Sequence, residues 1–356
     1  MTKKADYIIV GQGLAGTCLA FQLMALGKEV LIIDEQKDNT SSKVAAGLYN
    51  PVTGRNLVLT WKAHELFDYM TNFYTGIEQK LSSKFLYPTT IYRPFASMEE
   101  QNEWMGKSAD IKHEQFIENL HTKPAHDNHV KDPFGGLSLK NCGYLDIPEF
   151  LKASRNYFVK KDIVIDAPFN YEELVLNTEI NYKSIEAEKI IFCTGMEAKK
   201  TNLFEWLPFS LVKGEILDMV PQEKFNVIYN KGVFIMPRND DSYLVGATYE
   251  VVNIEEGITE KARNTLLEKL NAIFKINYKI TGQRAGIRPA TRDRKPFIGM
   301  HPEKPQIGIF NGLGAKGVTL APFFAKQFAE NLVNGLDLDK EVNVNRYNSL
   351  YFDSRS

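Results

Sequence analysis

Two glycine-rich segments near opposite ends of the chain carry the clearest chemical signal in the sequence. The first is GQGLAG at residues 11–16, and the second is NGLGAKG at residues 311–317. Each follows a short apolar run and opens a helical pattern. Each therefore predicts a helix N-terminus whose unpaired backbone N–H groups face an anion. Two such anion sites in one compact unit indicate a long ligand that is bound at both ends.

The residues around the first segment match a βαβ unit. The apolar run at 7–10 predicts a buried parallel strand, residues 14–26 have helical spacing, and Gly27 supplies a helix stop. A second apolar run, 30–33, ends at Asp34, where a carboxylate accepts hydrogen bonds from a ribose diol. The pattern predicts dinucleotide binding without choosing between NAD and FAD, and its alternative is an ordinary structural turn. Gly11 would allow the tight turn, Gly13 would let a pyrophosphate approach the backbone, and Gly16 would let the helix pack closely on the sheet.

Composition narrows the classes of partner. The chain has 356 residues, with 43 Lys and Arg against 44 Asp and Glu, a net charge of −1. This balance gives no general attraction to nucleic acid or to anionic lipid, so neither is an expected partner. Three cysteines without C-x-x-C spacing suit a reducing compartment, and no apolar stretch is long enough to span a membrane. We therefore expect a cytoplasmic protein.

Two further segments add to the pattern. The run IIFCTG at 190–195 predicts a third buried strand that brings backbone close to the nucleotide, and Asp146 with Glu149 predicts a helix start through a capping box. With these in place, the chain resembles the D-amino-acid-oxidase-like family of FAD-dependent oxidoreductases, which includes glycine and sarcosine oxidases. The segments 44–51 and 288–293 are also similar to the oxidase half of the bifunctional enzyme that modifies wobble uridines in tRNA. The resemblance rests on GQGLAG with Asp34, VAAGLYNP (44–51), GYLDIPEF (143–150), IIFCTG (190–195), KGEIL (213–217), VFIMPRNDDSYLVGATYE (233–250), AGIRPATRDRKPFIG (285–299) and NGLGAKGVTLAP (311–322).

The resemblance implies an α/β fold, α+β overall, in two parts. A Rossmann-type FAD-binding domain would combine residues 1–75, 145–205 and 286–356. A mainly antiparallel β-sheet, the substrate-binding domain, would combine 76–144 and 206–285. The short alternating runs within 214–250, which are broken by turn residues, support an antiparallel meander on their own.

The resemblance also implies the chemistry. A hydride equivalent would leave the carbon beside an amine for flavin N5, so that the carbon–nitrogen bond of an amino acid or N-substituted glycine is oxidised. Cys193 and Cys142 occupy strand and turn positions, so we expect FAD to be bound non-covalently. The electron acceptor is oxygen or an unidentified compound. The residues expected at the cofactor are Gly11, Gly13, Leu14, Ala15, Gly16, Asp34, Glu35, Ala45, Ala46, Gly47, Val164, Thr194, Gly195, Arg288, Gly312, Gly314, Ala315, Lys316, Gly317, Val318 and Thr319.

Three residues are the candidates for catalysis. In the family, the arginine of the motif that contains Arg288 pairs with the substrate carboxylate, a task that suits the planar guanidinium fork. The alternative is a structural ion pair with Asp293 or Glu215. Lys316 and the helix that follows it would place positive charge beside the flavin, whereas the alternative for Lys316 is a solvent-exposed loop lysine. Tyr49, with Asn50, would line the substrate cavity.

One departure from the family bears on the substrate. The tyrosine with which several amino-acid oxidases bind the substrate carboxylate falls on Phe234, which has no hydroxyl. Its substitutes could be Tyr229, Tyr243 or Tyr249. A larger or secondary amine is therefore at least as plausible a substrate as a simple D-amino acid.

Two other clusters of polar residues are interpreted as surface features. The segment that contains His121, His126, Asp127 and His129 has loop composition, so we expect a solvated loop rather than a metal site. The basic residues within 284–295 are interrupted by an aspartate, which argues against a nucleic-acid surface. A small-molecule amine is therefore the expected partner, and the alternative is a carboxymethylaminomethyl group of tRNA. A further alternative is a flavoprotein whose FAD is only structural.

Overall fold

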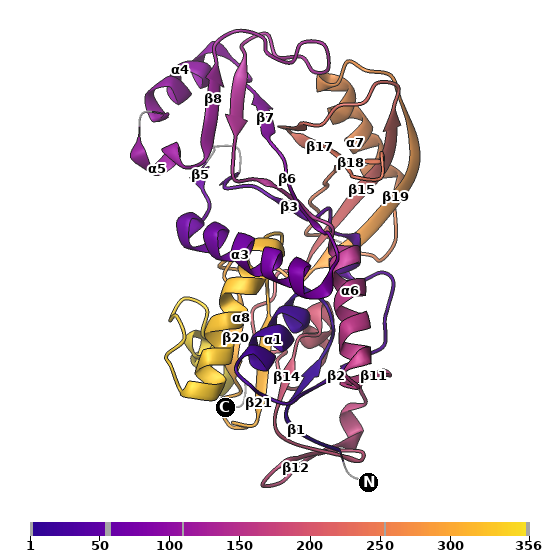
Figure 1. Cartoon of the computed structure of the whole chain (residues 1–356), viewed down its shortest axis with the longest axis vertical. Helices are drawn as coiled ribbons and strands as arrows, with labels where there is room; N and C mark the ends of the chain where they lie inside the picture. Colours follow the sequence, from indigo (N-terminus) through magenta and orange to yellow (C-terminus); the bar gives the residue numbers. More distant parts are fainter. Residues whose placement is uncertain (1–2, 54–57, 109, 253, 354–356) are drawn as a thin grey trace.

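The computed structural model describes residues 3–53, 58–108, 110–252 and 254–353. Two sheets dominate it, one in the lower and one in the upper half of Figure 1, and both chain ends lie in the lower half. Among the described residues, no helix is both long and apolar enough to cross a membrane. The mixed α/β architecture, with a parallel and an antiparallel sheet, confirms the predicted fold class.

The lower sheet is built around β1 (Lys3–Val10), which pairs in parallel with β2 (Val30–Asp34) and β14 (Ile185–Phe192). Its strands run in the order β11–β2–β1–β14–β21–β20, and the hairpin β12–β13 pairs with the first half of β14. Alternate residues of β1 enter different cores: Tyr7 and Ile9 pack on one side, Ile8 and Val10 on the other. A strand covered on both faces needs a continuous apolar run, which is why the sequence shows one there. The remaining strands are β11 (Val164–Asp166), β12 (Leu174–Leu176), β13 (Ile180–Tyr182), β20 (Phe297–Met300) and β21 (Ile307–Asn311).

Four helices pack together against one face of this sheet. Their buried side chains share one core cluster with Tyr7 and Ile9. Helix α6 begins after Asp146, whose side chain accepts a hydrogen bond from the backbone N–H of Glu149 at 3.2 Å, so the predicted helix start is confirmed. The four helices are α1 (Leu14–Ala25), α3 (Ala63–Leu81), α6 (Ile147–Lys160) and α8 (Gly317–Asn334), and the short helices of the lower half are α2 (Ser41–Val44), α9 (Asn348–Asp353), η1 (Tyr171–Glu173), η2 (Gly195–Lys200) and η3 (Val344–Tyr347).

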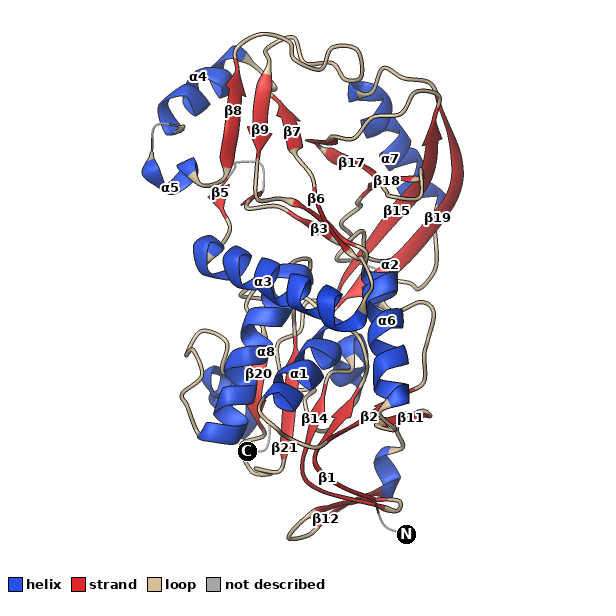
Figure 2. Ribbon diagram, in the orientation of Figure 1, coloured by secondary structure: helices blue, strands red, loops and turns tan. Residues whose placement is uncertain are grey.

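The upper sheet has eight strands in the order β19–β15–β18–β17–β16–β7–β9–β8, antiparallel except for the pair β16–β7 (Figure 2). Helix α7 (Glu260–Ile273) packs on it. Its strands are β7 (Ile91–Pro94), β8 (Ile117–His121), β9 (Gly136–Leu139), β15 (Val212–Pro221), β16 (Ile228–Lys231), β17 (Val233–Pro237), β18 (Tyr243–Gly246) and β19 (Tyr278–Arg288). Helices α4 (Met98–Lys107) and α5 (Ile111–Glu114) lie beside β8, and short strands between the halves are β3 (Leu48–Tyr49), β4 (Val52–Thr53), β5 (Val58–Leu59), β6 (Leu86–Pro88) and β10 (Gly143–Leu145).

The predicted boundaries cut through three elements, one of which is β10, divided between residues 144 and 145. Helix α3 continues past residue 75 to Leu81, and β19 keeps residues 286–288 in the upper sheet. The end of α3 therefore packs with the core of the lower half, and residues 286–288 belong to the upper sheet. Because β19 ends at Arg288, the upper sheet itself delivers this side chain to the space between the halves.

The histidine segment differs from the predicted solvated loop. The Nδ1 atoms of His129 and His126 lie 2.7 and 3.2 Å from the hydroxyl oxygen of Tyr229, which is fully buried. The buried Asp132 accepts hydrogen bonds from the N–H of His126 and from the Tyr92 hydroxyl. The segment is thus held against the upper sheet by polar contacts that only the fold brings together. Among the described residues, no group of three His, Cys, Asp or Glu side chains is arranged to hold a metal ion.

Candidate active site

Two cavities meet between the halves of the molecule. One has a volume of about 430 Å³ and contains Arg288, and the other has a volume of about 820 Å³ and contains Asp34. Both lie beside the carboxyl ends of the parallel strands, where ligands of open α/β sheets bind. The joined cavities form a long space with two differently lined ends. The residues that line both are Gly13, Ser41, Ser42, Cys193, Gly195 and Gly286.

The first glycine-rich turn borders both cavities. Gly11 has φ +99°, and a Cβ placed on it would lie 2.6 Å from the carbonyl oxygen of Cys193. A Cβ on Gly16 would lie 1.9 Å from the carbonyl oxygen of Gly11, so helix α1 can approach the turn only with glycine at both places. The N-cap residue Gly13 provides no side-chain cap, which leaves most of the N–H groups of the first turn open to an anion. The N–H of Leu14 donates to Ser42 Oγ at 3.2 Å.

Asp34 is held in place by three hydrogen bonds. Its carboxylate accepts from the N–H of Gln12 at 2.8 Å, from the N–H of Gln36 at 3.0 Å and from Arg155 Nη1 at 3.2 Å. The same Arg155 nitrogen donates to Gln12 Oε1 at 2.8 Å, and Arg155 Nη2 lies 3.2 Å from Asp166 Oδ2. Arg155 therefore ties helix α6 to the glycine-rich turn and to the acid at the end of β2. Sequence reasoning missed it, because it is 121 residues from Asp34 and belongs to no motif.

Most of the predicted cofactor residues line one cavity or the other. Val164 does not, because it lies in β11 and packs against the helix-side core, whereas Ala167, Pro168 and Phe169 form the cavity wall a few residues later. Gly16 and Gly312 also lie outside both linings and serve close packing instead. The predicted residues on the 820 Å³ cavity are Gly11, Gly13, Asp34, Glu35, Thr194 and Gly195, and those on the 430 Å³ cavity are Gly13, Leu14, Ala15, Ala45, Ala46, Gly47, Tyr49, Gly195, Arg288, Gly314, Ala315, Lys316, Gly317, Val318 and Thr319.

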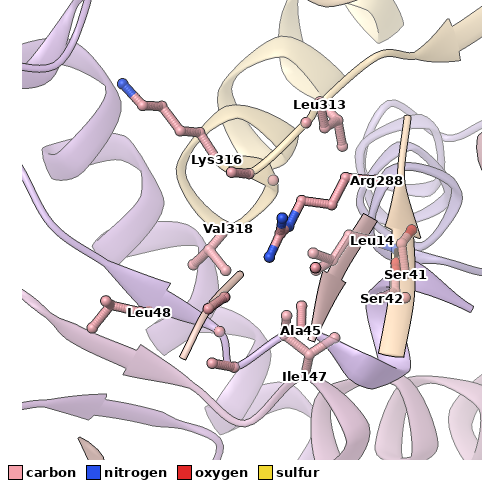
Figure 3. Close-up of a pocket in the computed structure, with 18 of the residues that line it drawn as sticks. Leu14, Ser41, Ser42, Ala45, Leu48, Ile147, Arg288, Leu313, Lys316 and Val318 are labelled. Carbon is pink, nitrogen blue, oxygen red and sulfur yellow. Dashed lines mark hydrogen bonds between the residues drawn. The ribbon is translucent and has the colours of Figure 1, made fainter. Parts of the chain in front are cut away.

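Arg288 places a positive charge in the smaller cavity without a carboxylate beside it. Figure 3 shows its guanidinium directed into the space among Leu14, Val318 and neighbouring residues. Among the described residues, its one hydrogen-bond acceptor is the carbonyl oxygen of Thr248, 3.5 Å from Nη1, and it takes part in no ion pair. Burial lowers the pKa of Arg288, although Tyr249 acts in the opposite direction.

The structural alternatives for Arg288 are both engaged elsewhere. Asp293 pairs with Arg346 Nε at 3.0 Å. Glu215 pairs with Lys213 Nζ at 3.2 Å and also accepts from Thr259. A desolvated guanidinium without a counter-ion is costly, so the cavity favours an anionic ligand at this point.

The second glycine-rich turn forms another wall of the smaller cavity. Gly314 has φ +54°, and α8 begins at Gly317 with Lys316 as its N-cap. The Lys316 side chain extends away from Arg288 (Figure 3), and the residue is exposed. Partial burial, together with the charges of Arg294 and Lys295, lowers the pKa of Lys316. The helix N-terminus, rather than the lysine side chain, is thus the positive group that faces the cavity.

Phe234 and Tyr49 also line this cavity. Burial raises the pKa of Tyr49, so its hydroxyl stays protonated. Two of the three possible substitutes for a tyrosine at 234 are used elsewhere: Tyr229 bonds to histidines, and Tyr243 bonds to the backbone of Phe225. Tyr249 alone of the three lines the cavity, at its exposed rim.

The fold and this pair of cavities fit an enzyme that binds a dinucleotide. Residues 6–331 match the family model described as FAD dependent oxidoreductase (DAO), and the chain belongs to this family. It is 24% identical over 348 residues to the bifunctional protein ThiO/ThiG of Nostoc sp., covering 92% of this chain and 52% of that protein. It is 23% identical to the tRNA 5-methylaminomethyl-2-thiouridine biosynthesis bifunctional protein MnmC of Campylobacter concisus, with coverage of 86% and 48%.

The chain thus spans about half the length of these curated relatives. Among solved structures, it is similar to the glycine oxidase from Geobacillus kaustophilus, with a TM-score of 0.76, 18% identity and coverage of 95% and 96%. That likeness concerns the fold. The cofactor of the family is FAD, and the residues present fit it: a helix N-terminus without a side-chain cap and a glycine-rich turn stand beside the Asp34 carboxylate, and small residues at 45–47 leave room for a ring.

Proposed function

We propose that the chain oxidises the carbon–nitrogen bond of an amino acid or an N-substituted glycine. The observation that carries this proposal is the guanidinium of Arg288, which lies in the smaller cavity and has no counter-ion within the described part of the chain. An α-carboxylate supplies the missing charge and accepts two parallel hydrogen bonds, which also fix the orientation of the substrate. FAD, when bound, accepts the hydride equivalent from the carbon beside the amine.

The lining of the cavity indicates which protonation state of the amine is bound. No Asp, Glu or His is among the described residues that line the cavity with Arg288. A protonated amine would therefore find no carboxylate there and would be repelled by Arg288 and by the positive end of α8. The substrate amine is bound neutral and loses its proton to solvent, without a side-chain general base.

The residues that would hold FAD come from both glycine-rich turns. Asp34, positioned by Arg155, would accept from the ribose, and the N-terminus of α1 would face the pyrophosphate. The N-terminus of α8 would favour negative charge at the other end of the cofactor, and Lys316 would add positive charge from the rim of the cavity. We further propose the predicted division into a cofactor domain and a substrate domain. The buried thiols of Cys18, Cys142 and Cys193 carry no disulfide, which supports a cytoplasmic site of action.

An anaerobic titration of the flavin absorbance tests the proposal. We expect glycine, sarcosine, proline or a D-amino acid to bleach the flavin band of the wild type, and admission of oxygen will show whether it is the acceptor. Arg288→Ala is expected to lower kcat/KM by about 100-fold while the flavin stays bound, because charge-assisted hydrogen bonds to the carboxylate are lost. The matched control is Arg284→Ala, which removes a cation on the same strand that is paired with Asp218. Equal effects of the two substitutions would contradict the role of Arg288.

A second candidate is the oxidation of a carboxymethylaminomethyl group on tRNA. It is favoured by Arg292 and Arg294, two exposed cations without an ion pair among the described residues. Arg294 is close enough to the rim of the smaller cavity to lower the pKa of Lys316. The test is the binding of tRNA at increasing salt. Affinity that falls steeply with salt and is reduced by Arg294→Ala would support this candidate.

A further inference from the structure

We infer that the substrate is an extended amine, with a flat apolar group beyond the nitrogen and a neutral hydrogen-bonding group at its far end, which Asn230 recognises. This inference rests on the proposed function, because it takes Arg288 as the anchor of the carboxylate. It goes beyond that function by assigning the substituent on the amine. Its basis is the face of the upper sheet that closes the smaller cavity.

A row of directly paired residues crosses this face. Asn230 on β16 pairs with Phe234 on β17, Phe234 pairs with Gly246 on β18, and Gly246 pairs with Ile216 on β15. Directly opposite residues of antiparallel strands project to the same face, and Asn230, Phe234 and Ile216 all line the cavity. The row therefore forms a continuous surface with an amide at one end.

The middle of this surface is flat and apolar because Gly246 has no side chain. A Cβ at this position would lie 2.6 Å from Ile216 Cγ2 and 2.9 Å from Phe234 Cζ. The Phe234 ring and the Ile216 side chain close over the glycine backbone instead. Such a floor suits an aromatic or heterocyclic ring, which packs well against another ring.

The Arg288 end lies on the other side of this floor. Its guanidinium rests on Gly214, two residues before Ile216 on β15. Asn230 and Gly214 are separated by three strand spacings of about 4.8 Å across the sheet and by a two-residue step of about 6.6 Å along β15. Because these two offsets are perpendicular, the backbones of the two residues lie about 16 Å apart. Side chains and a hydrogen bond of about 2.9 Å at each end leave a substrate length on the order of 10 Å. Glycine would fill only the end beside Arg288.

The amide of Asn230 is free to bind a ligand. Three asparagines line the cavity, and two are tied to backbone: Asn50 accepts from the N–H of Val52, and Asn311 bonds to Gly195 and Gly312. Among the described residues, the half-buried side chain of Asn230 has no recorded hydrogen bond. It therefore offers two donors and one acceptor, which favours a carboxamide or an imide edge as its partner.

A second carboxylate at this end is disfavoured. The cations that line the cavity are Arg288 and Lys316, and neither lies on β16. The neighbouring Lys231 directs its Nζ to the carbonyl oxygen of Phe95, 2.9 Å away. An anion beside Asn230 would lack the charge that Arg288 supplies at the opposite end, so the far group is neutral.

The test compares two matched pairs of compounds on the FAD-loaded protein. The substrates are N-benzylglycine and N-(4-carbamoylbenzyl)glycine, which differ only in the terminal carboxamide. Hippurate and 4-carbamoylhippurate have the same length but hold no oxidisable amine, so their Kd follows from perturbation of the flavin band. We expect the carboxamide to improve both kcat/KM and Kd by about ten-fold in the wild type.

The variants are Asn230→Leu and a control, Asn226→Ala, which alters an exposed asparagine just before β16. Asn230→Leu should abolish the preference for the carboxamide and lower sarcosine oxidation far less than oxidation of the carboxamide, and the control should alter neither. Equal values for the paired compounds in the wild type would overturn the inference, as would equal losses for sarcosine and the carboxamide in Asn230→Leu. If no glycine derivative bleaches the flavin and no hippurate perturbs it, the proposed function itself fails.

Discussion

Gly214→Ala is the substitution that most directly probes the placement of Arg288. A Cβ at position 214 would lie 2.1 Å from Nη2, 2.3 Å from Cζ and 2.4 Å from Nη1 of Arg288, whereas ordinary van der Waals contact begins near 3.4 Å. The guanidinium must therefore move by more than about 1 Å. A displacement of about 1 Å from the productive geometry can reduce a rate by about 100-fold. We expect Gly214→Ala to lower kcat/KM for carboxylate-bearing amines by that order, with the charge of Arg288 intact.

The assay is steady-state oxidation of the best substrate, with flavin content and thermal midpoint measured on the same samples. Gly282→Ala is the matched control, since it likewise adds a methyl group beside a charged side chain, 2.7 Å from Asp218 Oδ2, but lies on the neighbouring strand β19 and outside the cavity. We expect both substitutions to lower the midpoint of thermal unfolding by a similar amount. Only Gly214→Ala should also lower kcat/KM, and this result would support the role of the guanidinium position. If Gly214→Ala retained full kcat/KM with flavin bound, the guanidinium position would not govern turnover, and the anchor role would be refuted.

Three further predictions concern the cofactor, the pH dependence of stability and the substrate. Arg155→Met should weaken the binding of FAD about ten-fold in fluorescence titrations, because Arg155 positions Asp34, which would contact the ribose of FAD. FMN lacks this ribose, so its binding should be unchanged, and an equal loss of affinity for FMN would contradict the prediction. Burial, together with His121 and His129, lowers the pKa of His126 below its ordinary 6.5, although Asp132 opposes the shift. The unfolded chain then binds the proton more tightly, so stability should be full above about pH 6.5 and fall as the pH decreases; urea midpoints at pH 7.5 and 5.5 should differ more in the wild type than in His126→Gln. Phe234→Tyr should shift kcat/KM toward glycine and small D-amino acids about ten-fold by adding a hydroxyl beside the carboxylate site, and an unchanged ranking of substrates would count against that placement.

The local elements followed from the sequence because their signals are local. The run at 7–10 predicts a buried strand, and β1 contains it; the helical spacing at 14–26 predicts α1, which runs from Leu14 to Ala25. The predicted cap at Asp146 is the cap of α6. Each of these signals depends on neighbours within a turn or a strand, where periodicity, glycine and capping residues act directly.

The contacts that shape the candidate site were not accessible in this way. Arg155 reaches Asp34 across 121 residues, and Tyr229 reaches His126 across 103. Val164 was expected at the cofactor from the family resemblance, but the cavity wall is formed by residues 167–169, after β11 ends. A pattern along the chain gives the order of strands without giving their lateral neighbours, so it cannot say which side chains share a face.

The sequence by itself therefore determined the two glycine-rich turns, the acid after β2 and the presence of an arginine in the motif at 286–289, since each depends on residue type and local spacing. Only the tertiary structure decided that Arg288 has no carboxylate partner among the residues it describes, because the pairing of Asp293 and Glu215 depends on strands and helices distant in the chain. The strand register then set the floor of the cavity: the pairing of β15 with β19 placed Gly214 beneath the guanidinium, and the pairing of β18 with β17 placed Gly246 beneath Phe234. Both contacts join residues of neighbouring strands in the sheet, and they give the cavity its charged end and its flat apolar middle.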